Sequence, residues 1–302
     1  MRQKALWVVV IVVVSLMMIP FGTVQAQPPI PDDPTWGEID LGAITEIDLT
    51  ALPLVPEIGA YAQAVYQAGI EQGNNPHTFV KVGDCMTDND YFLIPIGEGN
   101  YDLGEYADLQ ATIEYFITDD LNSFARVSQA SLGGFNTSSI LESMWANPEF
   151  CEAGESPLAC EFRHMTPSIA LIMFGTNDVQ YLPAEQFDYF MRAIVIETLK
   201  NGTLPILSTF PHRPEFPEES ILYNQIVAHI AQDYELPLIN LWLALEDLPN
   251  QGVDPVETTH MTTPVESAQV CYFIGENLEA GFTVRNLLTL QTLDAVLATE
   301  GE

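Results

Sequence analysis

The sequence predicts an α/β protein in which helices cover both faces of a parallel sheet. Short, nearly continuous apolar runs rich in Val, Ile and Leu alternate along the chain with segments whose apolar residues have helical spacing. Strands that are apolar on both sides are typical of parallel sheets, since both faces of such sheets are buried. Three of the runs end in polar turns that contain glycine. The expected architecture is a three-layer α/β/α sandwich around a flavodoxin-like parallel five-stranded sheet.

Three of the expected strands lead directly into these polar turns. Residues 78–83 run into Gly83-Asp84-Cys85, residues 124–128 lead towards Ser131-Leu132-Gly133-Gly134, and residues 168–174 run into Gly175-Thr176-Asn177-Asp178. Because ligands collect at the carboxyl ends of parallel strands, the three turns are expected to meet at one edge of the sheet. The other two strands are expected at residues 204–208 and 237–241.

Amphipathic helices are predicted around these strands. Their apolar residues recur with a spacing of three or four, which places them on one face of a helix. The clearest such segments are residues 58–65, 106–117, 187–195 and 222–230.

The first residues of the chain are typical of a secretory signal peptide. Arg2 and Lys4 precede an apolar run over residues 5–19, and small residues then precede a predicted cleavage site before Gln27. The run is short for a membrane span, although an uncleaved N-terminal anchor is the alternative. We therefore expect an exported protein with a signal peptide over residues 1–26, a Pro-rich linker over 27–50 and a single α/β domain over 51–302.

The charge of the chain excludes several classes of partner. Loss of the signal peptide would leave seven Lys and Arg residues against 42 Asp and Glu residues. A surface this negative repels phosphate backbones and anionic lipid, so we expect no binding to nucleic acid or to a membrane surface.

The four cysteines divide into two pairs. Cys151 and Cys160 flank a turn-rich loop and are expected to form a disulfide, which would contribute a little under about 3 kcal/mol. Cys85 and Cys271 are then either two free thiols or a second disulfide, because spacing does not determine pairing. No metal site is expected, since no Cys and His residues have the close spacing of metal ligands.

A nucleophile at Cys85 would need a base that a third group orients. His260 follows the last expected strand, and Glu257 lies three residues before it, where its carboxylate can accept a hydrogen bond from the imidazole. His212 follows the fourth expected strand and is a candidate substrate contact. The other three histidines lie at the opposite end of the sheet or within a helix.

Three blocks of the sequence together resemble those of the SGNH (GDSL-type) hydrolases. Gly83-Asp84-Cys85, Gly175-Thr176-Asn177-Asp178 and Glu257-x-x-His260 are similar, in order, to that family's Gly-Asp-Ser, Gly-x-Asn-Asp and Asp-x-x-His blocks. The resemblance spans roughly residues 77–275, and the second block is the most specific match. It implies an SGNH-hydrolase-like fold, ester hydrolysis without a cofactor, and an ester of a small molecule or a glycan as substrate.

The resemblance also implies a role for each site residue. Cys85 would be the nucleophile, His260 the base and Glu257 the orienting group. The Asn177 amide and backbone N–H groups at the Cys85 turn, at Ser131 and at Gly175 would form the oxyanion hole. The chain departs from the family at Cys85, Glu257 and Ser131, where the family has serine, aspartate and glycine.

Two functions follow from this pattern. The first is a secreted ester hydrolase of the esterase, lipase or acetylesterase type, since a thiol beside a histidine is a competent nucleophile. The alternative is a catalytically inactive extracellular protein of the same fold that binds a glycan or another ligand. A Cys85–Cys271 disulfide, or a buried Cys85 thiol, would favour the alternative.

Overall fold

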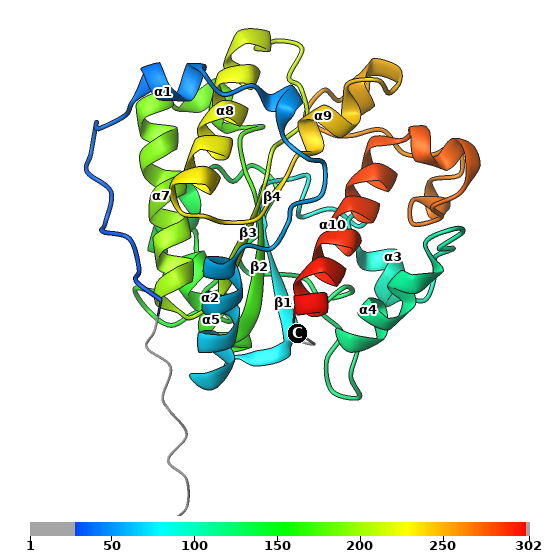
Figure 1. Ribbon diagram of the computed structural model, residues 1–302, viewed down its shortest axis with the longest axis horizontal. Helices are drawn as coiled ribbons and strands as arrows, with labels where there is room; N and C mark the ends of the chain where they lie inside the picture. The colour runs from blue at the N-terminus through cyan, green and yellow to red at the C-terminus, as the bar shows by residue number, and fades with distance from the viewer. Residues whose placement is uncertain (1–27, 300–302) are drawn as a thin grey trace, which may run out of the picture.

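The structure is a computed structural model that describes residues 28–299 (Figure 1). Its centre is a sheet of parallel strands in the order β1-β2-β3-β4. Helices lie on both faces of this sheet, which confirms the predicted α/β/α sandwich (Figure 1). The strands are β1 (Asn75–Gly83), β2 (Pro167–Met173), β3 (Leu204–Ser208) and β4 (Leu238–Ile239).

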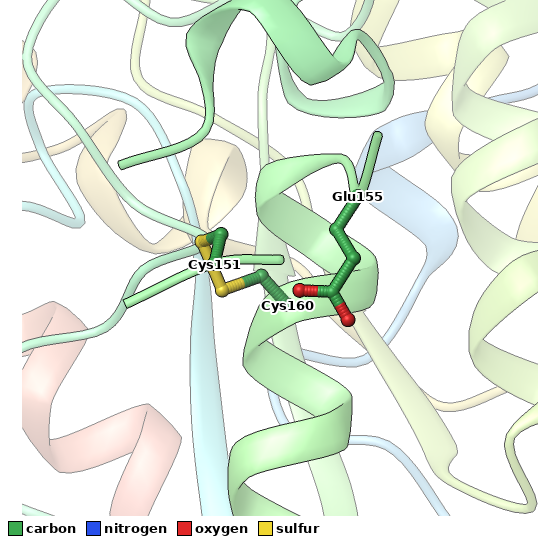
Figure 2. A group of neighbouring side chains, drawn as sticks. All are labelled: Cys151, Glu155 and Cys160. Atoms are coloured by element: carbon green, nitrogen blue, oxygen red, sulfur yellow. A yellow bond between two sulfur atoms is a disulfide. The ribbon is translucent and has the colours of Figure 1, made fainter. Parts of the chain in front are cut away.

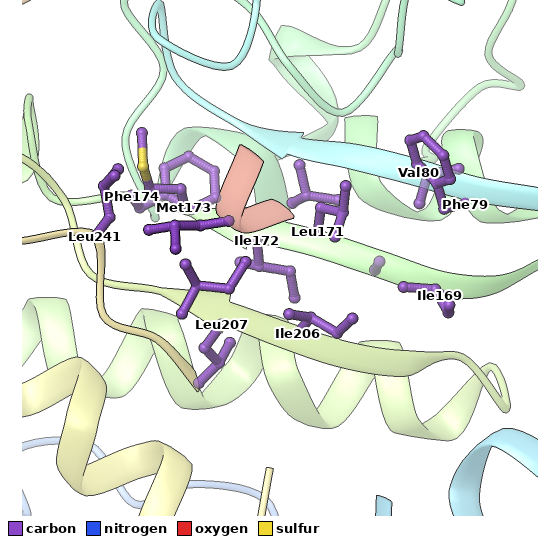
Figure 3. Packing of buried hydrophobic residues seen from close by; sticks show 14 of the residues in the cluster. Phe79, Val80, Ile169, Leu171, Ile172, Met173, Phe174, Ile206, Leu207 and Leu241 are labelled. Atoms are coloured by element: carbon purple, nitrogen blue, oxygen red, sulfur yellow. The ribbon is translucent and has the colours of Figure 1, made fainter. Parts of the chain in front are cut away.

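The strands are buried because their side chains are packed on both sides. Every residue of β2 is buried, which explains why its sequence is a continuous apolar run rather than an alternating one. Lys81 is a buried exception in β1; its Nζ donates to the Phe124 carbonyl at 3.2 Å, and burial lowers its pKa to about 8. Figure 3 shows the packing of β1, β2 and β3 through Phe79, Val80, Ile169, Leu171, Ile172, Ile206 and Leu207.

The helices form one layer on each side of the sheet (Figure 1). On one side α7 packs against α8, with α2 and α5 in the same layer, and on the other side α10 packs against α4. The predicted helices at 58–65, 106–117, 187–195 and 222–230 correspond to α2, α4, α7 and α8. The helices are α1 (Leu41–Thr45), α2 (Ala60–Glu71), α3 (Ile94–Gly97), α4 (Gln110–Tyr115), α5 (Pro157–Met165), α6 (Asp178–Tyr181), α7 (Ala184–Lys200), α8 (Pro217–Asp233), α9 (Leu241–Leu245) and α10 (Gly281–Ala298).

Short 3₁₀ turns punctuate the connecting loops. They are η1 (Leu49–Ala51), η2 (Ala107–Leu109), η3 (Ser139–Leu141), η4 (Ser143–Trp145), η5 (Pro249–Gly252), η6 (Ser267–Gln269) and η7 (Gly275–Glu279).

The prediction of a strand at residues 124–128 is wrong, so the sheet formed by residues 28–299 has four strands instead of five. Phe124 is fully buried and its ring packs edge-on against other core phenylalanines. Arg126 Nη2 and the Gln129 N–H both donate to the carboxylate of the buried Glu161, the second at 2.8 Å. These contacts hold residues 124–129 in a loop, where a strand would need its backbone groups for the ladder.

Pairing with β1 begins just after that loop. The Gly83 N–H donates to the Ala130 carbonyl at 3.0 Å, and Gly83 forms an isolated parallel bridge with Ser131. The fifth strand is therefore reduced to one bridge on the free side of β1, beside the end of the strand that carries Cys85.

The N-terminal part of the described chain lies against the domain. Ile44 of α1 is fully buried, α1 packs against α8, and the Leu54 carbonyl accepts the Asn240 N–H just after β4. The predicted signal peptide, residues 1–26, lies outside the described residues, and the linker and domain boundaries stay predictions. Between residues 28 and 299, no helix has the length and apolar character that crossing a membrane requires.

The predicted disulfide between Cys151 and Cys160 is confirmed (Figure 2). Glu155, in the loop between the two cysteines, accepts hydrogen bonds from Arg163 Nε at 2.5 Å and Nη2 at 2.8 Å. These bonds lower the pKa of Glu155 to about 2. The loop is thus closed by a covalent bond and by an ion pair, and its two sulfurs are bonded to each other instead of being available as thiolate ligands.

Candidate active site

The end of β1 is a tight turn that carries Cys85. Gly83 has no room for a side chain, because a Cβ there would lie 2.4 Å from Thr87 Oγ1 and 2.5 Å from a carbonyl of β2. Asp84 closes the turn, since its Oδ1 accepts the Met86 N–H at 3.0 Å and its carbonyl accepts the Thr87 N–H at 2.9 Å. The Cys85 side chain is left half-buried at the carboxyl edge of the sheet.

Residues 254–262, which we call the His260 loop, reach the Cys85 turn from beyond β4. The Cys85 thiol donates to the Thr259 carbonyl, with Sγ 3.7 Å from the oxygen. The next residue is His260, whose Nδ1 lies 2.9 Å from Glu257 Oε2. With Nδ1–H donated to that carboxylate, Nε2 is the ring nitrogen left to accept a proton. The structure therefore places the loop that carries His260 and Glu257 against the Cys85 turn, where the thiol is hydrogen-bonded to the Thr259 carbonyl.

The polar block after β2 is fixed to the loop that follows Ser131. Asn177 Nδ2 donates to the Phe135 carbonyl at 2.7 Å, and an amide nitrogen has a second hydrogen to offer a ligand. The buried Asp178 carboxylate accepts the Thr137 N–H at 2.8 Å and the Gly175 N–H at 3.1 Å. The Asn177 amide is thus held by the Phe135 carbonyl, and the next residue, Asp178, ties the same block to Thr137.

The loop at residues 131–134 passes beside the nucleophile. A Cβ built on Gly133 would lie 4.0 Å from Cys85 Cβ, and the Gly133 N–H donates to Asp88 Oδ2 at 3.0 Å. Ser131, a predicted backbone donor, begins this loop at its bridge to β1. Gly175, the other predicted donor, uses its N–H for Asp178 in this structure.

The surroundings of Cys85 favour a neutral thiol at rest. Burial raises the pKa of the thiol to about 12, and the neighbouring Asp84 carboxylate also raises it, whereas the Arg213 guanidinium lowers it. A thiol with this pKa is almost wholly protonated near neutral pH. Attack by Cys85 would therefore need a base that takes the proton during the reaction.

Three buried charged residues at the site were missed by sequence reasoning. Arg285 of α10 is 4% exposed and donates to the Met86 carbonyl at 2.6 Å and to Thr87 Oγ1 at 2.9 Å, so it holds the Cys85 turn from below. Burial lowers the pKa of Arg285 to about 9. Asp84 is fully buried and Arg213 is 3% exposed. One signal was present, because the chain has only nine Lys and Arg residues and Arg285 interrupts an otherwise uncharged stretch.

Cys271 and His212 occupy separate places. Cys271 is fully buried and not bonded to Cys85, and its Sγ accepts a hydrogen bond from Asn286 Nδ2 at 3.3 Å. The second disulfide that the sequence left open is therefore not formed. His212 is half-buried in the loop after β3, next to Arg213.

Comparison with known proteins finds similarity among solved structures. No family model matches the sequence, and no curated protein matches it. The chain is similar to the psychrotrophic esterase EstA from Pseudoalteromonas sp. (13% identity, 74% of this chain and 99% of that chain covered, TM-score 0.46). It is also similar to the lipase/acylhydrolase from Enterococcus faecalis (19% identity, 71% of this chain and 93% of that chain covered, TM-score 0.46). A third similar structure is an acetyl xylan esterase from Geobacillus stearothermophilus (16% identity, 72% of this chain and 94% of that chain covered, TM-score 0.46).

Proposed function

We propose that this protein hydrolyses ester bonds by acyl transfer through Cys85. The observation that carries the proposal is the contact of Cys85 Sγ with the His260 loop at Thr259, while Glu257 orients the His260 ring. The contact supports the proposal because nucleophilic catalysis needs a nucleophile close to a base that a third group orients, and His260 is the residue next to Thr259. The ordered resemblance of the three sequence blocks to SGNH hydrolases supports the same reaction.

In the acylation step, Cys85 Sγ attacks the ester carbonyl carbon as its proton passes to His260 Nε2. The carbonyl oxygen becomes an oxyanion, which accepts hydrogen bonds from the second Asn177 amide hydrogen and from the Ser131 backbone N–H. The carbon–oxygen bond to the alcohol then breaks, and the alcohol leaves with the proton from the His260 imidazolium. Cys85 is left as a thioester of the acyl group.

In the deacylation step, His260 takes a proton from water as the water oxygen attacks the thioester carbon. The carbon–sulfur bond breaks, and the sulfur regains its proton from the imidazolium. The products are a carboxylic acid and the original thiol, so no oxidant, reductant or cofactor is consumed. The small-molecule or glycan ester expected from the resemblance is the proposed substrate class.

The test is hydrolysis of short acyl esters by the purified protein under reducing conditions, with aryl acetates and acetylated sugars as substrates. We expect release of acid with saturation kinetics. We also expect intact mass to show one acyl group on Cys85 after rapid quenching, with the adduct lost in hydroxylamine, as a thioester would be. Lack of turnover on every acetyl, aryl and sugar ester would contradict the proposal.

A non-catalytic binding protein is the second candidate, and one observation favours it. Burial raises the pKa of the Cys85 thiol to about 12, which keeps the nucleophile protonated at rest. This candidate predicts glycan binding that Cys85→Ala leaves unchanged, with no acyl adduct on any cysteine.

We also propose that the protein is exported. The sequence of residues 1–26 supports a cleaved signal peptide, and the Cys151–Cys160 disulfide suits an oxidising compartment. Expression in a secreting host is expected to yield protein in the medium that begins at Gln27. Recovery of a membrane-bound chain that begins at Met1 would instead indicate the uncleaved anchor.

A further inference from the structure

The loop after β3 contains a buried cation that contacts two parts of the candidate site. The Arg213 side chain is only 4% exposed, and its guanidinium lies over the Phe216 ring at 5.6 Å. Its Nη1 donates to the Thr176 carbonyl, in the block that carries Asn177, and its Nε donates to Glu215 Oε2 at 3.3 Å. A buried guanidinium is costly unless its N–H groups are hydrogen-bonded, so these partners define where it sits.

Glu215 extends this connection to the His260 loop. Its other carboxylate oxygen, Oε1, accepts a hydrogen bond from the Thr258 hydroxyl. That bond lowers the pKa of Glu215, so the carboxylate stays ionised and the hydrogen bond is charge-assisted. Thr258 is followed by Thr259, whose carbonyl accepts the Cys85 thiol, and then by His260.

We propose that Arg213 is a positioning residue for the proposed ester hydrolysis. Arg213 holds the His260 loop over Cys85 through Glu215 and Thr258. We call these three residues the brace. The inference rests on the proposed function, but the brace itself is a property of the loop and can be measured without substrate. Glu257 is 70% exposed and orients the ring within the loop, whereas the brace connects the middle of the loop to the segment after β3.

The first test is hydrogen exchange of peptides that cover residues 254–262, in the otherwise intact chain. The His260 N–H donates to the Glu257 carbonyl and the Asp254 N–H to the His260 carbonyl, so their exchange reports on opening of the loop. Thr258→Val, which removes the hydroxyl and keeps the shape, is expected to speed exchange about fivefold. Thr258→Ser is expected to restore the slow exchange.

Two matched controls come from neighbouring positions. Thr263→Val makes the same change just beyond the His260 loop, and Glu218→Gln makes the charge change of Glu215→Gln at an exposed position on α8. Neither control is expected to alter exchange of residues 254–262, whereas Glu215→Gln is expected to act like Thr258→Val. Wild-type exchange in Thr258→Val and Glu215→Gln, or equal acceleration in the controls, would overturn the inference.

The second readout is the kinetic effect on ester hydrolysis. Because the brace places the base and not the substrate, Thr258→Val is expected to lower kcat about fivefold with KM nearly unchanged. Arg213→Lys keeps the charge but cannot serve both partners with a planar fork, so it is expected to lower kcat further. A KM effect at constant kcat would contradict positioning. A wild-type protein without esterase activity would defeat the proposed function alone, since hydrogen exchange still tests the brace.

Discussion

Replacement of Cys85 by alanine is expected to lower kcat for a short acyl ester by at least about 1,000-fold. The side chain lies at the end of β1 and contacts the His260 loop, with Sγ 3.7 Å from the Thr259 carbonyl oxygen. Without the sulfur no acyl-enzyme can form, and the remaining oxyanion donors would give only residual catalysis. Initial rates with an aryl acetate, measured against the uncatalysed reaction, provide the comparison.

Loss of the base is expected to be as severe as loss of the nucleophile. The raised thiol pKa of about 12 means that Cys85 depends on His260 to take its proton. We therefore expect His260→Ala to lower kcat as much as Cys85→Ala does. The double variant should lose no more than either single variant, because the two residues act as one unit. Glu257→Gln should lower kcat much less, because the Glu257 side chain is 70% exposed and orients the ring without transferring a proton.

Cys271→Ala is the matched control for Cys85→Ala. Cys271 is the other free thiol and is fully buried, and its Sγ accepts a hydrogen bond from Asn286. Its loss should lower the melting temperature but leave kcat within about twofold at temperatures where the protein is folded. Wild-type turnover by Cys85→Ala would exclude the thioester route.

The parallel sheet was predictable because its strands are apolar on both sides. β3 was predicted at residues 204–208 and is observed at Leu204–Ser208, while β4 is only Leu238–Ile239 of the predicted 237–241. The prediction of a strand at residues 124–128 failed because the pattern of apolar residues does not reveal which groups a buried carboxylate binds. Glu161, far along the chain, draws Arg126 and the Gln129 N–H into a loop.

The sequence predicted the candidate site residues that follow strands. It did not reveal the buried arginines that contact those residues from other elements. Cys85 and Asn177 follow β1 and β2 closely, so their approach to one edge could be inferred from topology, whereas His260 lies in the longer segment after β4 and was predicted from its sequence block. Arg285 reaches the Cys85 turn from α10, and Arg213 reaches Thr176 across the sheet edge. Contacts of this kind depend on side-chain packing between distant elements, which periodicity does not encode.

Replacement of Asp84 by asparagine is expected to remove a large part of the pH dependence of folding. Asp84 is fully buried; Oδ1 accepts the Met86 N–H, and Oδ2 has no hydrogen-bond partner among residues 28–299. Burial raises the pKa of this carboxyl from 3.8 to about 7, and the nearby Asp178 carboxylate adds to the rise, whereas Arg285 opposes it.

The direction of the effect follows from where the proton is held. Between about pH 4 and pH 7, the unfolded chain has lost the Asp84 proton while the folded protein keeps it. The stability that Asp84 contributes is therefore full below pH 4, declines as pH rises, and is lost above pH 7. A rise of this size corresponds to about 4 kcal/mol of unfolding free energy across the window.

Urea unfolding of the wild type and Asp84→Asn at intervals from pH 4 to pH 8 would measure this difference. Asparagine keeps an acceptor for the Met86 N–H and cannot ionise, so the two stability curves should diverge by up to about 4 kcal/mol as pH rises to 7. Asp178, whose pKa is raised to about 6 mainly by burial, gives both proteins a slope over the lower part of the window. The difference between the curves therefore reports the titration of Asp84 together with its electrostatic coupling to Asp178.

Asp90→Asn is the matched control, because Asp90 is exposed and lies six residues further along the same segment. Its stability curve should run parallel to that of the wild type from pH 4 to pH 8. Parallel curves for Asp84→Asn would mean that Asp84 is ionised throughout this range, balanced by Arg285 on α10. In that case the Cys85 turn would rest on a buried ion pair instead of a neutral carboxyl, and the negative charge beside Cys85 would be present at every working pH. The measurement thus determines the electrostatic environment of the thiol independently of any ester substrate.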